Sequence, residues 1–166
     1  MPSLANSSAA ADPPAPADGA TCLRIHVGEG IPLPRGLARL IDPIAAAVHD
    51  STGLTGVVAL RLTDDAEMSR LNGAFAGQPS ATDVLAFSSG DPEHPGDIAM
   101  SLERVRSQAL ALGHGIEREF GYLLTHGLLH LAGFGHDDDA AQRQMRRVEE
   151  TVMAAVGLLR DHKPVR

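Results

Sequence analysis

The sequence has one cysteine, Cys22, among its 166 residues. A single thiol cannot form an internal disulfide, which suits a reducing compartment. The chain also lacks any run of about 20 apolar residues of the kind that spans a bilayer. Its first 20 residues contain neither the basic stretch nor the continuous apolar stretch of a secretory signal. We therefore expect a soluble, cytoplasmic protein that makes no contact with a membrane.

Basic residues are also in the minority. The chain has 14 lysines and arginines against 21 aspartates and glutamates, which gives a formal net charge of −7. Proteins that bind nucleic acid through bulk electrostatics need clustered basic side chains, because their affinity comes from counterion release. The composition weighs against a broad basic surface of this kind. Any contact with RNA is therefore expected to be local.

The length is that of a single domain with its own hydrophobic core. Residues 1–20 are small, polar or proline and predict a disordered N-terminal tail. Residues 21–158 form the predicted domain, and residues 159–166 form a C-terminal tail. No internal repeat or linker interrupts the domain.

Patterns typical of strands and helices follow one another through this domain. The predicted strands are residues 22–27, 56–62, 83–87 and 97–100. The predicted helices are residues 33–49, which Pro43 kinks or restarts, 64–75, 101–113, the segment that carries the histidines, and a last helix capped by Asp138. The loop between the last two strands could line a site. The order predicts an α+β fold with about four strands in one mixed sheet packed with helices.

Three of the eight histidines lie close together, in the segment HGLLHLAGFGH. His126 and His130 are four residues apart, so a helix places both imidazoles on one face. The surrounding helix is apolar nearly all round, which predicts that it is buried. Gly133 and Gly135 follow, and they allow a sharp turn that would bring His136 back towards the other two histidines.

Three neutral imidazoles with a fourth position left to water are typical of a catalytic zinc site, whereas structural sites are usually closed by four protein ligands. The sequence therefore predicts one Zn²⁺ per chain, held by His126, His130 and His136 on a buried helix and the turn after it. The alternative is that these histidines are ordinary residues of a packed helix and its turn.

The same spacing of histidines and glycine occurs in zinc peptidases, in which a glutamate after the first histidine is the general base. Here that position is Gly127, which cannot take a proton, so a peptidase is disfavoured. Asp137, Asp138 and Asp139 directly follow the third histidine. We take Asp137 as the acid that orients an imidazole or acts as the base, and we expect at least one of the three to cap the next helix.

The segment HGLLHLAGFGH, preceded by REFGYLLT and followed by an acidic helix start, resembles the signature of the YbeY family of bacterial endoribonucleases and rRNA maturation factors. The upstream segments RLNGAFAG, TDVLAF and GDIAMS are similar to other blocks of that family, in the same order and with similar spacing. The resemblance covers about residues 22–157.

This resemblance implies a single α+β domain and a zinc ion on the three histidines. It further implies cleavage of single-stranded RNA, linked to 3′-end maturation of 16S rRNA and to quality control of the 70S ribosome. The expected partner is RNA, as an rRNA precursor, the ribosome or its 30S subunit, and DNA is not expected. Thr82 and Asp83 match the family's Thr-Asp pair at the start of the third strand and are candidate catalytic residues. Their structural alternative is to cap and position that strand.

The chain departs from the family pattern at three positions. Ala76 stands where the family usually has an arginine that is thought to meet substrate phosphate, and this removes a charge-assisted contact. Arg70 on the same predicted helix could partly substitute, although it would face elsewhere. Gly135 replaces an acid and Ser88 replaces a proline. The three histidines are unaffected, so these differences concern the rate of RNA cleavage.

Ala76 also supports a second hypothesis from another class of protein. The chain would then be a ribosome-assembly factor whose zinc mainly holds the fold and whose nuclease activity is weak. The substitution Ala76→Arg separates this hypothesis from the first, because only an attenuated nuclease would gain activity from it.

Overall fold

The computed structural model describes residues 22–76 and 82–159. The elements in these ranges are β1 (Leu23–Val27), α1 (Arg35–Ala38), α2 (Ile41–Thr52), β2 (Gly56–Thr63), α3 (Asp65–Ala76), β3 (Val84–Asp91), β4 (His94–Ser101), α4 (Leu102–Leu112), α5 (Ile116–Leu131) and α6 (Asp139–Ala155). The predicted tails lie outside the described residues, except for Leu159 at the start of the second.

The strands form one four-stranded sheet in the order β1-β2-β4-β3. β1 pairs with β2 in parallel, and β2 pairs with β4 in parallel. β3 runs antiparallel to β4 and forms the other edge of the sheet. The predicted α+β fold with a mixed four-stranded sheet is confirmed.

The connection between β3 and β4 differs from the predicted loop. β3 continues to Asp91 and β4 begins at His94, so the two strands form a tight hairpin. Ser88 pairs with Gly96 and Asp91 with His94, with an irregular register between these pairs. The glycines and prolines of this segment gave it a low strand propensity, but pairing across the hairpin extends both strands. The segment is therefore part of the sheet.

The helical segment before β2 is interrupted, as Pro43 suggested. α1 ends at Ala38 and α2 begins at Ile41, which places Pro43 in the first turn of α2. Proline is tolerated there because a first-turn N–H has no partner within the helix. The prediction of a restart is confirmed.

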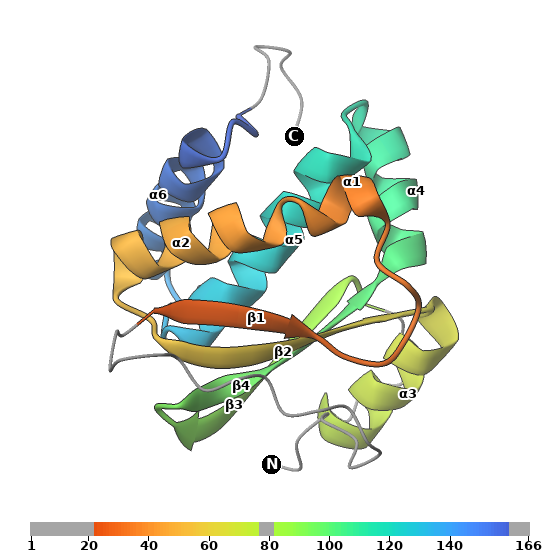
Figure 1. Cartoon of the computed structure of the whole chain (residues 1–166), viewed down its shortest axis with the longest axis horizontal. Coiled ribbons are helices and arrows are strands. Elements are labelled where there is room, and N and C mark those ends of the chain that lie inside the picture. Colours follow the sequence, from red (N-terminus) through yellow and green to blue (C-terminus); the bar gives the residue numbers. More distant parts are fainter. Residues whose placement is uncertain (1–21, 77–81, 160–166) are drawn as a thin grey trace.

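The two faces of the sheet are covered by different helices (Figure 1). α3 lies on one side, where Met68 and Leu71 pack with Ala99 of β4. The other helices gather on the opposite side, where Gly127 of α5 lies against Ile98, the neighbour of Ala99 in β4. Successive strand residues point to opposite faces, so β4 contributes to both cores.

α5 is the central helix of the larger layer, and it contacts β3, β4, α2, α4 and α6. Most of its side chains are buried, and Phe120, Leu124, Leu128 and Leu129 are fully enclosed. The prediction that the histidine helix is buried is confirmed. In the parts of the chain that the structure describes, no helix is long and apolar enough to cross a bilayer.

Candidate metal centre

His126 and His130 lie near the C-terminal end of α5 and project from the same face of the helix. Their ring centroids are 4.6 Å apart, and the rings meet edge to face at 84°. The two Nε2 atoms are 3.1 Å apart. The four-residue spacing therefore produces the neighbouring pair of imidazoles that the sequence predicts.

The chain returns towards this pair directly after α5. Gly133 adopts a φ of 96°, a left-handed conformation that favours glycine. The Phe134 N–H then donates to the Leu129 carbonyl at 3.0 Å, which closes the turn. His136 follows, with its ring centroid 5.2 Å from that of His130 and 6.2 Å from that of His126. The structure thus brings the three predicted imidazoles together.

The geometry can be compared with the needs of zinc. Two nitrogens bound to one tetrahedral Zn²⁺ at about 2.0–2.1 Å are about 3.3–3.4 Å apart. The separation of 3.1 Å between the Nε2 atoms of His126 and His130 is close to this value. Within residues 22–76 and 82–159, however, no three His, Cys, Asp or Glu side chains are already arranged for coordination. The fit to zinc therefore rests on three imidazole donors near one another, and metal binding stays a prediction.

Burial affects the protonation of the His130 imidazole. It lowers the pKa of His130 below the ordinary value, and repulsion from the charged forms of His126 and His136 acts in the same direction. A backbone hydrogen bond with Phe134 and the charge of Glu149 oppose this shift. A lowered pKa keeps His130 neutral near pH 7, and only a neutral imidazole has a lone pair for a metal.

A carboxylate from α6 completes the surroundings of His126. Glu149 Oε1 lies 2.8 Å from His126 Nδ1, and Glu149 is only 7% exposed. The sequence analysis did not select Glu149. The signal for it was its position on α6, because Met145, Glu149 and Val152 share one helix face and the other two side chains are buried. An acidic residue on a buried helix face indicates a specific partner.

The acids after His136 have different surroundings. Asp138 is the N-cap of α6, and its Oδ1 accepts from the Ala141 N–H at 2.7 Å. The expectation that one of these acids caps the helix is therefore confirmed for Asp138. Asp137 is exposed in the bend directly after His136. Its catalytic role stays a prediction.

Thr82 and Asp83 lie immediately before β3 and are partly buried. Asp83 Oδ1 accepts from the Val84 N–H at 2.8 Å, and the Asp83 carbonyl accepts from the Ser101 N–H at 3.0 Å. Asp83 Oδ2 accepts a longer bond, of 3.4 Å, from Gln108 Nε2 of α4. These bonds position the start of β3. The catalytic role of both residues remains a prediction.

Gly127 lies where α5 meets the sheet most closely. A Cβ atom at this position would be 3.1 Å from Ile98 Cδ1, a tight contact. The position that carries the catalytic glutamate of a zinc peptidase therefore has no room here for a larger side chain without movement of the core. This tight contact agrees with the prediction that a peptidase is disfavoured.

Arg70 forms a salt bridge with a residue of its own helix. Its Nε and Nη2 donate to the two carboxylate oxygens of Glu67, at 2.8 and 2.7 Å. This fork lowers the pKa of Glu67 and raises that of Arg70. α3 ends at Ala76, whose side chain lies outside the described part of the structure. Arg70 would have to leave Glu67 in order to replace the missing family arginine.

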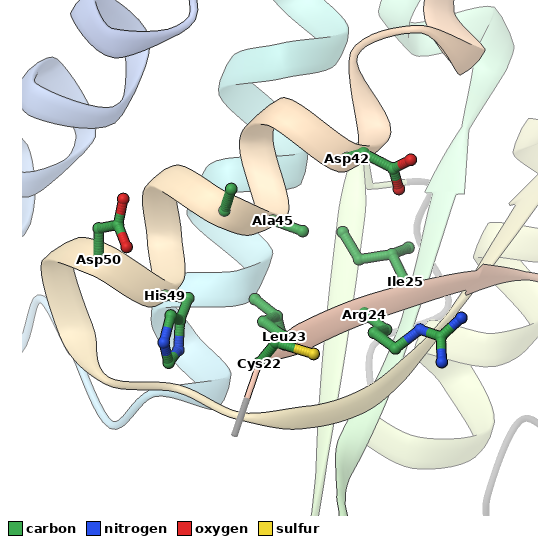
Figure 2. A pocket seen from close by; sticks show the side chains of 9 residues that line it. Cys22, Leu23, Arg24, Ile25, Asp42, Ala45, His49 and Asp50 are labelled. Atoms are coloured by element: carbon green, nitrogen blue, oxygen red, sulfur yellow. The ribbon is translucent and has the colours of Figure 1, made fainter. Parts of the chain in front are cut away.

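A separate pocket of about 420 Å³ lies between β1 and α2 (Figure 2). Cys22 and His49 lie towards one end of it, and Arg24 lies further along β1. His49 Nδ1 is bonded to the Leu54 carbonyl at 2.9 Å. None of the residues that line this pocket is a predicted site residue, so it is distinct from the candidate metal centre.

Comparisons with known proteins identify the family of this chain and agree with its fold. Residues 33–157 match the sequence model of the family described as Endoribonuclease YbeY. A protein of that name from Desulfitobacterium hafniense is 45% identical over 130 residues, which cover 70% of this chain and 83% of the relative. Another, from Chloroflexus aurantiacus, is 36% identical over 153 residues, covering 84% of this chain and 97% of the relative.

Among solved structures, a solution structure of a Thermotoga maritima protein is similar, with a TM-score of 0.56 and 28% sequence identity. The match covers 80% of this chain and 89% of that protein. The family match spans most of the chain and includes all three clustered histidines. The chain belongs to the YbeY endoribonuclease family.

Proposed function

We propose that this chain is a zinc-dependent endoribonuclease that cleaves single-stranded RNA in the cytoplasm. Its task would be 3′-end maturation of 16S rRNA and quality control of ribosomes, with an rRNA precursor, the ribosome or its 30S subunit as partner. The observation that supports this proposal is the meeting of three imidazoles at the end of α5. The relatives' name, Endoribonuclease YbeY, supplies the class of reaction.

His126, His130 and His136 are the residues that would hold the ion. A zinc ion held by three imidazoles supplies a Lewis acid for a phosphoryl oxygen and activates water near neutral pH. The protein's own part is to present neutral imidazoles, and the burial of His130 serves this end. Asp137, exposed beside His136, is the candidate for moving a proton during cleavage.

The test combines metal content with RNA cleavage. We expect untagged wild-type protein to contain about one zinc per chain by mass spectrometry and to cut single-stranded RNA. His126→Ala should lose both properties, because it removes one of three ligands. His94→Ala is the control, since His94 is an exposed histidine of the β3–β4 hairpin. Wild-type protein without metal would refute the proposal.

The ribosome-assembly factor with a mainly structural zinc is the second candidate, and Ala76 is the observation that favours it. We expect Ala76→Arg to raise RNA cleavage about tenfold or more, as one charge-assisted phosphate contact contributes about 1.5–3 kcal/mol. Ala74→Arg, at an exposed position of the same helix, is the matched control. No gain from Ala76→Arg, with weak cleavage by the wild type, would favour the assembly role.

A further inference from the structure

We propose that Glu149 is a positioning residue of the metal centre, which holds His126 in the tautomer that directs its Nε2 lone pair towards His130 and His136. This inference rests on the proposed function, because it concerns how the metal ligands are prepared. It adds a fourth side chain to the site, from a helix that carries none of the three histidines.

The hydrogen bond between Glu149 and His126 determines the tautomer. Glu149 Oε1 and His126 Nδ1 are 2.8 Å apart. An ionised carboxylate can only accept hydrogen bonds, so the proton must be on Nδ1. In a neutral imidazole this leaves the lone pair on Nε2. That atom lies 3.1 Å from His130 Nε2, which places the free lone pair on the side where the imidazoles meet.

The burial of Glu149 indicates that its carboxylate serves to bind a specific partner and not merely to keep the surface of α6 polar. The Glu149 side chain is 9% exposed, and it shares a buried helix face with Met145 and Val152. Burying a carboxylate costs free energy unless a partner compensates it. An apolar side chain at this position could be buried on the same face of α6 at a lower cost in free energy. The next residue, Glu150, is exposed and shows where an ordinary acidic residue of α6 lies.

α6 contacts the site at a second point. Gln142 Nε2 donates to the His136 carbonyl at 3.3 Å. Asp138 caps the start of the same helix, two residues after His136. One face of α6 therefore holds the His126 ring and the backbone of His136, so the helix supports two of the three imidazoles. Hydrogen-bonded carboxylates of this kind orient metal-binding histidines and raise their basicity.

The experiment measures zinc affinity and the tautomer of His126 in parallel. Zinc is titrated against a chromophoric chelator in wild type, Glu149→Ala and Glu149→Gln, with Glu150→Ala as the matched control. The His126 tautomer in metal-free protein is read from the ¹⁵N shifts of its ring nitrogens. We expect Glu149→Ala to weaken zinc binding about 10–100-fold and to lose the pure Nδ1–H form. Glu149→Gln retains the shape and should have an intermediate affinity, and Glu150→Ala should behave as wild type.

The outcomes separate this inference from the proposed function. Unchanged zinc affinity in both Glu149 variants would overturn the positioning role and leave the zinc-dependent nuclease standing. Wild-type protein that binds no zinc would overturn both. If Glu149→Ala does not fold, the decision passes to Glu149→Gln, whose amide oxygen still accepts a hydrogen bond but lacks the charge. A Gln variant that folds, no longer holds His126 in the Nδ1–H form and still binds zinc as tightly as wild type would then overturn the positioning role.

Discussion

The surroundings of the His130 imidazole make the stability of the folded chain depend on pH. Burial, followed by the neighbouring His126 and His136, lowers its pKa in the folded chain below the ordinary value of 6.5. The unfolded chain therefore binds this proton more readily. The contribution of His130 to stability is complete above about pH 6.5 and is lost as the pH falls through the lower pKa of the folded state.

We accordingly expect metal-free protein to lose stability as the pH falls below about 6.5, as measured by urea unfolding. Part of this loss should be absent in His130→Gln, which cannot take up the proton. His94→Gln, at an exposed position, should retain the full loss. Identical pH slopes for the wild type and His130→Gln would contradict the prediction.

Gly127 provides a second prediction at the scale of one residue. In Gly127→Glu the new Cβ would lie 3.1 Å from Ile98 Cδ1, and the carboxylate would be directed into the core between α5 and β4. We expect a loss of at least about 2 kcal/mol of unfolding free energy, and no gain of peptidase activity. Ala74→Glu, at an exposed position of α3, should cost little by comparison. Peptide hydrolysis by a folded Gly127→Glu protein would contradict the prediction that a peptidase is disfavoured.

At the scale of elements, α6 depends on its N-cap, Asp138, for its position beside the site. The Asp138 side chain accepts from the Ala141 N–H at 2.7 Å. We expect Asp138→Ala to cost about 0.5–2 kcal/mol in urea unfolding, because it leaves a helix-terminal N–H without its cap. Asp139→Ala changes the next residue without removing a cap and should cost less. Equal losses in the two variants would mean that general charge at the helix start, and not the cap, stabilises α6.

The elements also show which features of the site could be predicted from the sequence and which could not. The four-residue spacing of His126 and His130 and the glycine after α5 predicted the cluster, because helix and turn geometry act over a few residues. The contact between His126 and Glu149 joins residues 23 positions apart, and it depends on how α6 packs on α5. Periodicity could reveal that Glu149 is on a buried face, but it could not name the partner. The hairpin extension of β3 and β4 likewise depends on pairing between strands, which local propensity does not report.

In the whole molecule the candidate metal centre lies where α5, the segment after it and α6 meet. α5, which carries two of the imidazoles, packs on β3 and β4 and also contacts α2 and α6. His136 lies in the segment that leads from α5 into α6, and Glu149 connects α6 back to His126. An ion shared by these three imidazoles would connect α5 to the start of α6. Folding and metal binding should therefore be linked.

This linkage gives the prediction at the scale of the whole chain. A ligand that binds only the folded state at 100 times its dissociation constant stabilises that state by about 2.7 kcal/mol. For a domain of this size such a gain raises the melting temperature by roughly 5–10 °C. We expect a chelator to lower the Tm of untagged wild-type protein by about this amount, and excess zinc to restore it. His130→Ala should show no chelator effect, whereas His49→Ala should keep it, because His49 is bonded to the Leu54 carbonyl beside the pocket between β1 and α2. A Tm that does not respond to the chelator in zinc-loaded wild-type protein would mean that the three imidazoles bind no ion that matters for folding.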